Sequence, residues 1–156
     1  KGALNNEHLL QAVSGVRALI EAEYERGIPP KRLVLAGFSQ GGAVALHAAT
    51  CRTSETETPL QVAGVLALST YLPNSTAVVP PGDGETPIFQ AHGSFDPLIP
   101  FELATLSHRV LRDAGWSVQF QEYPTAHQIS EAEIRDIGFF LRGVLANGLD
   151  SERTRG

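Results

Sequence analysis

The chain has 156 residues, 42% of them hydrophobic and 19% charged, which fits one domain with a packed core and excludes an intrinsically disordered chain. Twelve Lys and Arg residues against seventeen Asp and Glu residues give a formal charge of −5, and the positive residues are scattered along the sequence. This balance argues against nucleic acid or an anionic membrane as the main partner.

Helix and strand patterns alternate along the chain. Over residues 7–26 the apolar positions recur every three or four residues, which predicts an amphipathic helix with Asn5 or Asn6 as its cap and Gly27 at its end. Short apolar runs without polar alternation predict strands that are buried on both faces. These strands are expected at residues 32–36, 62–68, 87–91 and 117–123, and further helices at residues 43–49, 101–114 and 130–145.

The order of these elements predicts the fold class. Alternating strands and helices indicate an α/β fold with a mostly parallel sheet, right-handed crossovers and helices on both faces. Ser130 and Glu133 have the spacing of a capping box, which predicts where the last helix begins. We expect residues 1–147 to form a single domain and residues 148–156 to form a frayed polar tail.

In a sheet of this kind, ligand sites form at the carboxyl ends of the strands, so residues that directly follow a strand are the candidates for chemistry. A GxSxG pattern lies between the first strand and a small-residue helix, and it consists of Gly37, Phe38, Ser39, Gln40 and Gly41. At such a turn the serine adopts a strained backbone, and the two glycines let neighbouring chain pass. The start of the helix directs backbone N–H groups, that of Gln40 among them, at an oxyanion. The alternative is a tight turn without a catalytic role.

A serine hydroxyl needs a base to act as a nucleophile, most often a histidine that a carboxylate orients. Asp96 and His127 each follow a predicted strand, so both are expected at the same edge of the sheet as Ser39. The order Ser, Asp, His along the chain is that of the α/β-hydrolases. Asp96 stands before Pro97, and such a pair is also common in plain turns and helix caps.

The other histidines and the single cysteine are interpreted as structural. His8, His47 and His108 fall within predicted helices, where surface or packing roles are expected. His92 follows its strand so closely that we expect it to hold the loop through hydrogen bonds and not to move protons. Cys51 has no cation or base beside it in the sequence and is expected to be a small apolar filler.

Cellular setting is indicated by two further features. One cysteine cannot close an intrachain disulfide, and it has no Cys or His neighbours at the spacing of a zinc site. No apolar run is long enough to cross a bilayer, and the N-terminus lacks the pattern of a signal peptide. We therefore expect a cytoplasmic protein without stable membrane insertion.

Four segments carry a resemblance to a known family, and they occur in the order LVLAGFSQGGAVALHAA, VAGVLALSTYLP, HGSFDPLIP and YPTAHQIS. They resemble the carboxylesterase and acyl-protein thioesterase family of α/β-hydrolases, especially its bacterial carboxylesterases. The resemblance runs over about residues 5–145. It implies Ser39 as the nucleophile, Asp96 as the acid and His127 as the base, and it implies no metal and no organic cofactor.

Two departures from the family pattern matter. The family usually has Gly before the catalytic histidine, where this chain has Ala126, a change that matters only if the backbone there needs a positive φ. Family members also carry further strands and a His-Gly loop with the second oxyanion donor, and none of these precedes Glu7. The expected fold is therefore a truncated α/β-hydrolase in which the strand at residues 32–36 has an open edge. We predict that two copies pair there, or that another segment covers the edge, and that the protein is a homodimer or larger homo-oligomer.

The function expected from these features is that of a serine carboxylesterase, which hydrolyses short to medium acyl esters through an acyl-enzyme intermediate. The resemblance places the segment at residues 69–73 beside the acyl-binding pocket, and the residues expected to line this pocket are Tyr71, Leu72, Leu98 and Ile99. One alternative is a catalytically weak hydrolase scaffold that acts as a binding module. Another is an acyl-protein thioesterase or lysophospholipase, which shares the same chemistry on a small thioester or lipid ester substrate.

Overall fold

The structure is a computed structural model, and it describes residues 5–55, 57–84 and 86–153. Four strands form one sheet in the order β1-β2-β3-β4, and every neighbouring pair is parallel. Their carboxyl ends therefore meet at one edge of the sheet, as the sequence predicted. The strands are β1 (Val34–Phe38), β2 (Gly64–Leu68), β3 (Ile88–Gly93) and β4 (Val118–Tyr123).

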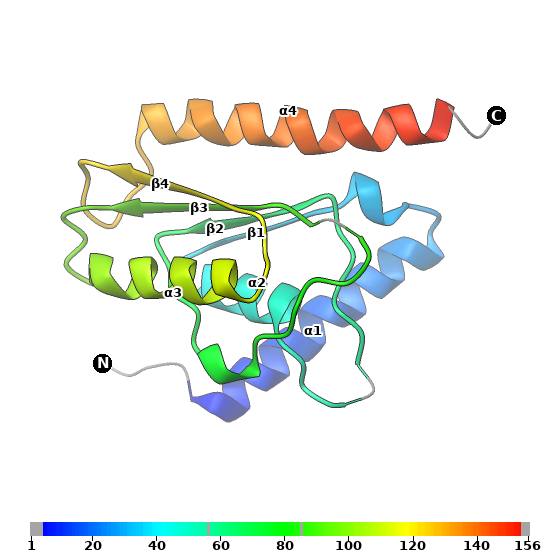
Figure 1. The fold of residues 1–156 in the computed structure, drawn as a ribbon, viewed down its shortest axis with the longest axis horizontal. Helices are drawn as coiled ribbons and strands as arrows, with labels where there is room; N and C mark the ends of the chain where they lie inside the picture. The colour runs from blue at the N-terminus through cyan, green and yellow to red at the C-terminus, as the bar shows by residue number, and fades with distance from the viewer. Residues whose placement is uncertain (1–4, 56, 85, 154–156) are drawn as a thin grey trace.

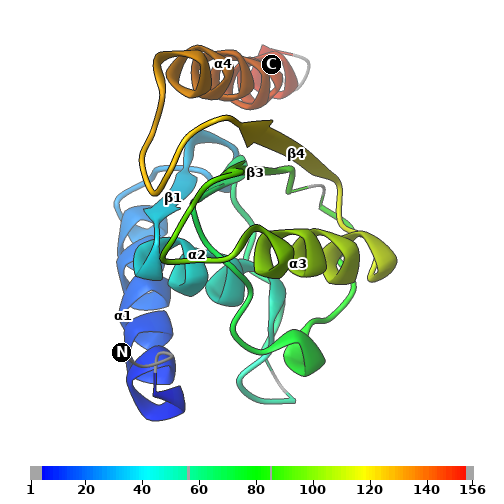
Figure 2. The same ribbon diagram turned by 90° about the vertical axis from the view of Figure 1, so that its left-hand side faces the viewer.

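Helices cover both faces of this sheet. The long helix α4 lies on one face, whereas α2 and α3 lie on the other and α1 packs against α2 (Figures 1 and 2). This arrangement confirms the predicted α/β fold with helices on both faces. The helices are α1 (Asn6–Glu25), α2 (Gln40–Thr50), α3 (Phe101–Asp113) and α4 (Glu131–Arg153), with short 3-10 turns at Pro30–Arg32 and Ser75–Ala77.

The core occupies both sides of the two central strands. All residues of β2 and β3 are buried, because helices cover both faces and each strand has a neighbour on either side. Successive residues such as Val65 and Leu66 point to opposite faces and join different core clusters. On the α4 side, Phe89 packs against Phe140 with 5.6 Å between ring centroids. The continuous apolar pattern of these two strands is therefore explained by burial on both faces.

Strand β1 departs from that pattern. It was predicted to be buried on both faces, but its residues are only partly buried, and Ala36 and Phe38 are exposed. The reason is its place in the sheet, since β1 is an edge strand that pairs with β2 alone within the described residues. The open edge that the sequence analysis expected is present at this strand.

Both ends of α1 and the start of α4 lie where the sequence signals predicted them. The Asn5 side chain accepts a hydrogen bond from the Glu7 N–H at 3.2 Å and so caps α1, and Gly27 has a φ of 91° just after its end. The Ser130 hydroxyl accepts a hydrogen bond from the Glu133 N–H at 3.2 Å, which confirms the predicted start of α4. At the end of β4 the Tyr123 hydroxyl ties the strand to α4.

The C-terminal end of α4 lies further along the chain than predicted. The helix continues to Arg153, although the sequence analysis ended it at Leu145 and expected a frayed segment over residues 148–156. Extension of a formed helix needs no new nucleus, and no proline interrupts this stretch, so the helix propagates through polar residues. Residues 154–156 of the predicted tail lie outside the described residues.

Glu133 on the first turn of α4 provides a test of this packing. It is 1% exposed, and burial raises the pKa of its carboxyl although a hydrogen bond from the Ser130 backbone opposes this shift. The folded protein therefore keeps this proton to a higher pH than the unfolded chain, so stability is lost as the pH rises above about 4.3. Glu133→Gln retains the capping geometry without the charge. We expect it to raise the Tm by a few degrees at about pH 8 and to change it little at about pH 4.

The measurement is thermal unfolding followed by circular dichroism across that pH range. Glu131→Gln is the matched control, because Glu131 lies on the same turn and is exposed. A lower Tm for Glu133→Gln than for the native chain at the higher pH would show that the buried carboxylate is stabilising, contrary to this prediction.

Candidate active site

Ser39 forms the turn between a strand and a helix by itself. Strand β1 ends at Phe38 and α2 begins at Gln40, so the helix starts three residues earlier than the sequence predicted. The backbone of Ser39 has a φ of 54°, a region that residues other than glycine rarely adopt. The predicted strained turn is therefore present, and the serine lies at the carboxyl end of β1. The backbone N–H of Gln40 belongs to the first helical turn, whose N–H groups have no acceptor within the helix.

Close packing around the turn depends on Gly37 and Gly42. A Cβ at position 37 would collide with the backbone of Gly41, and a Cβ at position 42 would come within 2.6 Å of the Thr70 side chain. A Cβ at Gly41 would meet no atom within 4 Å. The GxSxG pattern predicted close approach at both of its glycines, whereas the structure requires it at Gly37 and at Gly42 instead of Gly41.

Two hydrogen bonds, one to the last residue of β2 and one from the loop that follows it, hold the turn in place. The Ser39 N–H donates to the Leu68 carbonyl at 2.9 Å, and the buried Thr70 hydroxyl donates to the Ser39 carbonyl at 2.6 Å. Thr70 was singled out in the sequence only as part of a pocket segment. The signal that could have found it is its place directly after the strand that neighbours β1, where a hydroxyl reaches the turn.

The three predicted residues Ser39, Asp96 and His127 meet at this edge of the sheet. The Nε2 atom of His127 lies 3.0 Å from Ser39 Oγ, and its Nδ1 atom lies 2.6 Å from Asp96 Oδ2. The carboxylate accepts, so Nδ1 carries the proton and Nε2 is free to accept the serine proton. The side chain of Asp96 is fully buried and that of His127 is 14% exposed. A hydroxyl, an imidazole and a carboxylate therefore form one continuous hydrogen-bond chain.

Asp96 is held as a charged carboxylate. Its Oδ1 atom accepts the backbone N–H groups of Leu98 at 2.8 Å and Ile99 at 2.9 Å. Burial raises the pKa of Asp96, but the hydrogen bonds from Ile99, His127 and Leu98 outweigh this effect and keep the pKa below its usual value. The plain-turn interpretation of Asp96 is therefore incomplete, since Oδ1 serves the turn while Oδ2 contacts His127.

The loop that carries His127 is fastened to the loop that carries Asp96. The Phe95 N–H donates to the Thr125 carbonyl at 3.0 Å, which extends the pairing of β3 and β4 beyond the strands. A Cβ at Gly93 would collide with the Thr125 and Ala126 carbonyls, so only glycine permits this approach. Ala126 is not among the positive-φ residues, and the alanine is therefore compatible with the backbone before His127.

Phe38 is a neighbour of the site that the sequence analysis missed. Its ring centroid lies 4.8 Å from that of His127, with 50° between the planes. Phe38 is 39% exposed, so it packs on the imidazole at the surface of the site. Phe38 occupies a variable position of the GxSxG pattern, and nothing in the sequence indicated its contact with His127.

The four predicted pocket residues lie in two loops and differ in exposure. Leu98 is 68% exposed, and Tyr71 and Ile99 are half-buried. Leu72 is 7% exposed and joins the core, and its N–H donates to the Ser107 hydroxyl of α3 at 2.8 Å. Their role in an acyl pocket stays a prediction, and Leu72 is the one of the four that packs in the core.

The residues interpreted as structural occupy matching positions. His8 is exposed, His47 is buried within α2, and the His108 ring stacks on an aromatic neighbour. The His92 ring donates to a loop carbonyl, as expected. Cys51 is buried, and burial raises the pKa of its thiol to about 11, so it is not a nucleophile at neutral pH.

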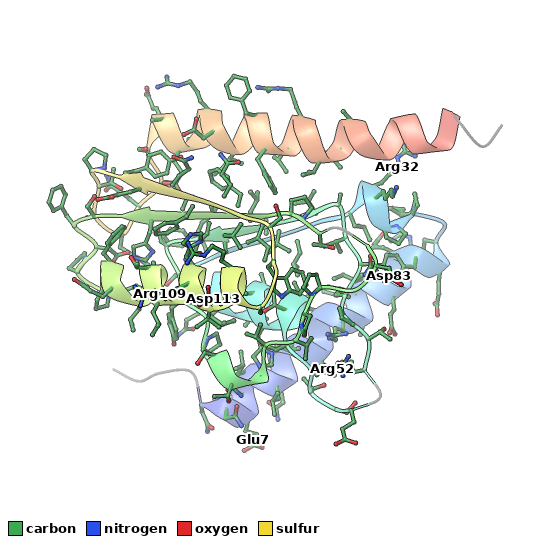
Figure 3. All side chains as sticks on the ribbon, viewed as in Figure 1. Glu7, Arg32, Arg52, Asp83, Arg109 and Asp113 are labelled. Carbon is green, nitrogen blue, oxygen red and sulfur yellow. The ribbon has the colours of Figure 1, made fainter. Side chains whose placement is uncertain are left out.

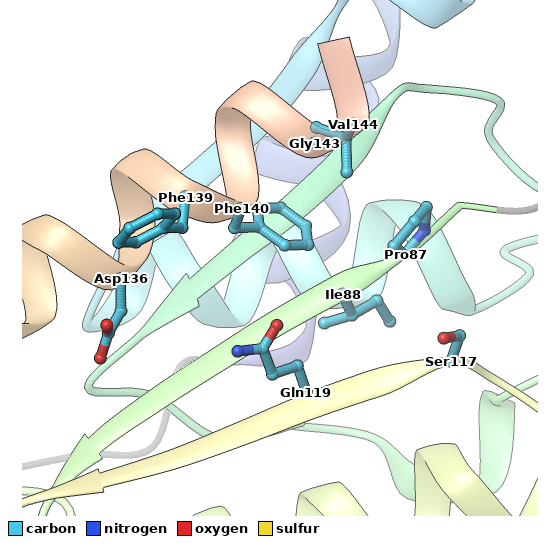
Figure 4. Close-up of a pocket in the computed structure, with 9 residues that line it drawn as sticks. All are labelled: Pro87, Ile88, Ser117, Gln119, Asp136, Phe139, Phe140, Gly143 and Val144. Carbon is cyan, nitrogen blue, oxygen red and sulfur yellow. The ribbon is translucent and has the colours of Figure 1, made fainter. Parts of the chain in front are cut away.

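Other features of the described residues lie away from Ser39. A groove of about 530 Å³ lies between α4 and β4, but its lining includes Pro87 and Ser117, which precede their strands at the opposite end of the sheet (Figure 4). The positive side chains Arg32, Arg52 and Arg109 lie on different parts of the molecule (Figure 3). Among the described residues, no three His, Cys, Asp or Glu side chains could hold a metal ion, and no helix is both long and apolar enough to cross a membrane.

Comparison with known proteins identifies the family of this chain. The model of the phospholipase/carboxylesterase family matches residues 3–145. The chain belongs to this family. Acyl-protein thioesterase 1 of Neurospora crassa is 38% identical over 129 residues, which are 79% of this chain and 50% of that protein. A probable carboxylesterase of Oryza sativa subsp. japonica is 32% identical over 148 residues, which are 92% of this chain and 53% of that protein.

Solved structures of related proteins share the fold. The crystal structure of Arabidopsis thaliana SOBER1 has a TM-score of 0.78 and 27% sequence identity, and the match covers 92% of this chain and 68% of SOBER1. The Bacillus cereus carboxylesterase matches with a TM-score of 0.76 at 18% identity, over 92% of this chain and 65% of that protein, and shows the fold alone. This phospholipase/carboxylesterase chain spans about half the length of the curated relatives it matches.

Gly93 tests how the loops of this family member position His127. In Gly93→Ala the added methyl group collides with the Thr125 and Ala126 carbonyls, so the loop that carries His127 must shift relative to β3. A shift of about 1 Å can cost about a hundredfold in rate, and we expect hydrolysis of p-nitrophenyl acetate to fall at least about tenfold. Gly143→Ala is the control, because a Cβ there meets nothing within 4 Å. Activity of Gly93→Ala within twofold of native, in a folded variant, would contradict the expected displacement.

Proposed function

We propose that the chain is a serine hydrolase that cleaves carboxylic esters through an acyl-enzyme intermediate. In this mechanism Ser39 attacks the ester carbonyl while His127 accepts its proton, and the imidazole then returns the proton to the leaving alcohol. Water repeats the sequence on the acyl-enzyme. Asp96 holds His127 in the productive tautomer and stabilises the imidazolium that forms.

The observation that carries the proposal is the hydrogen-bond chain from Ser39 through His127 to Asp96. Its two distances, 3.0 Å and 2.6 Å, are those of a nucleophile and base already in contact, with the base oriented by a buried carboxylate. Membership of the phospholipase/carboxylesterase family supports the same chemistry. The proposal covers this chain, which spans about half the length of its curated relatives.

The proposed substrates are esters with short to medium acyl chains. Tyr71, Leu98 and Ile99 lie in the loops that follow β2 and β3, at the same edge of the sheet as Ser39, and we propose that they line the acyl pocket together with the more deeply buried Leu72. Thioesters remain within the proposal because a relative carries the name acyl-protein thioesterase, and lysophospholipids remain within it because the family includes phospholipases by name. Attack on each of these substrates proceeds through the same acyl-enzyme.

Stabilisation of the oxyanion is assigned to the backbone N–H of Gln40 at the start of α2. Removal of one donor from an oxyanion hole typically costs about a hundredfold to a thousandfold in turnover. Among the described residues, Gln40 is the one donor assigned to this role. Turnover with a single donor would be weak, and this supports a second candidate function, a binding module with the hydrolase scaffold. The two candidates differ in whether Ser39 is activated.

Substitution of the nucleophile tests the proposed mechanism. We expect Ser39→Ala to lower hydrolysis of p-nitrophenyl acetate at least about a thousandfold, because the attacking group is lost. Ser75→Ala is the control, since Ser75 is exposed on a short turn outside the site. A fluorophosphonate probe should label the native chain and the control at Ser39, and it should fail to label Ser39→Ala. Retained activity in Ser39→Ala would overturn the serine mechanism, and an unlabelled native chain would favour the binding module.

The open edge of β1 supports a proposed homo-oligomer. Its outer backbone N–H and C=O groups have no partner strand among the described residues, and an unpaired edge of this kind readily pairs with another chain. We expect light scattering to report at least twice the 16.7 kDa of one chain at micromolar concentration. A stable monomer at that concentration would contradict the pairing.

A reducing, cytoplasmic setting is also proposed, because the only cysteine, Cys51, is buried and free.

A further inference from the structure

A second imidazole lies beside the carboxylate of the candidate site. His92 is the penultimate residue of β3 and has no exposed surface. Its Nε2 atom lies 3.6 Å from Asp96 Oδ2, the same oxygen that His127 contacts at 2.6 Å. Asp96 is therefore placed between two histidines, of which only His127 reaches Ser39.

The surroundings of His92 determine its tautomer. Its Nε2 atom lies 2.8 Å from the Ile99 carbonyl, which can only accept, so Nε2 carries the proton. Its Nδ1 atom is buried and has no hydrogen-bond partner. A proton on Nδ1 would be a buried donor without an acceptor, which is costly. The Nε2–H of His92 is therefore directed at the loop that follows Asp96.

One residue of that loop links His92 to the carboxylate. The Ile99 carbonyl accepts the His92 N–H, and the Ile99 backbone N–H donates to Asp96 Oδ1 at 2.9 Å. The hydrogen bond from His92 on β3 therefore holds the backbone of Ile99, and Ile99 in turn holds Oδ1 of Asp96. The other oxygen is then left facing His127 Nδ1.

We propose that His92 is a positioning residue that clamps the turn between Asp96 and Ile99 and so aims the carboxylate at His127. It touches neither the substrate nor Ser39, and it supplies no proton. Its effect on turnover rests on the proposed function, whereas its effect on the geometry of Asp96 and His127 does not. Both effects can be measured separately.

The kinetic experiment compares two substitutions at this position. His92→Leu fills similar space without a donor, whereas His92→Gln retains a side-chain N–H. A hydrogen bond to a neutral carbonyl is worth about a factor of three to ten, so we expect His92→Leu to lower kcat for p-nitrophenyl acetate by that factor with KM within twofold. His92→Gln should recover most of the loss. A kcat within twofold of native for His92→Leu would overturn the proposal.

A double-substitution cycle distinguishes positioning through Asp96 from a general packing defect. If His92 acts through the carboxylate, His92→Leu should cost little further activity in the Asp96→Asn background, where the charge that it aims is absent. An equal loss in both backgrounds would overturn the proposed route. Residual activity in Asp96→Asn is measured by the rate of fluorophosphonate labelling, which detects slow serine chemistry.

Nitrogen-detected NMR of the histidine rings gives a readout that needs no turnover. Native His92 should be protonated at Nε2 and bare at Nδ1, and the opposite tautomer would overturn the proposal even if no variant at position 92 folds. The Nδ1–H of His127 should exchange faster with water in His92→Leu than in His92→Gln or the native chain. If these signals behave as expected but the fluorophosphonate does not label the native chain, the positioning role of His92 is supported and only the proposed hydrolase function is overturned.

Discussion

The candidate site depends on the backbone of Ser39, which is held in a conformation that its own side chain disfavours. A positive φ at such a residue costs about 1–3 kcal/mol, and it persists only when the surrounding structure compels it. Here the β2 side of the turn supplies that constraint through the Leu68 carbonyl and the Thr70 hydroxyl, while Gly37 and Gly42 allow the chain to close up. The serine oxygen is therefore placed by the sheet and by the start of α2 together.

The remaining groups are brought to this turn by parallel pairing. Ser39 and His127 are 88 residues apart in the chain, yet both follow strands of one sheet whose carboxyl ends coincide. The loops after β3 and β4 stay paired beyond the strands, because Gly93 admits the carbonyls of the neighbouring loop. Burial makes the Asp96 charge costly, and the local N–H donors offset that cost, so the loop is shaped around an ionised carboxylate.

Several structural details were outside the reach of sequence patterns, each for a physical reason. The apolar run of β1 resembles those of β2 and β3, but burial depends on neighbours, and β1 has one where they have two. The polar segment after Leu145 continues as helix because propagation needs no apolar face. Thr70 and Phe38 contact the site from positions whose residue types carry no specific signal, so their roles follow only from contacts across the sheet.

Sequence patterns were enough to predict the α/β class and the approximate strands and helices, and to single out Ser39, Asp96 and His127 as candidates, because these follow from local periodicity and from which residues come directly after strands. The contacts among the three side chains, the close approach at Gly42 instead of Gly41 and the place of His92 beside Asp96 became visible only in the folded chain. The reason is that hydrogen-bond geometry and close packing arise between segments far apart in the chain, whereas residue patterns report on neighbours along it.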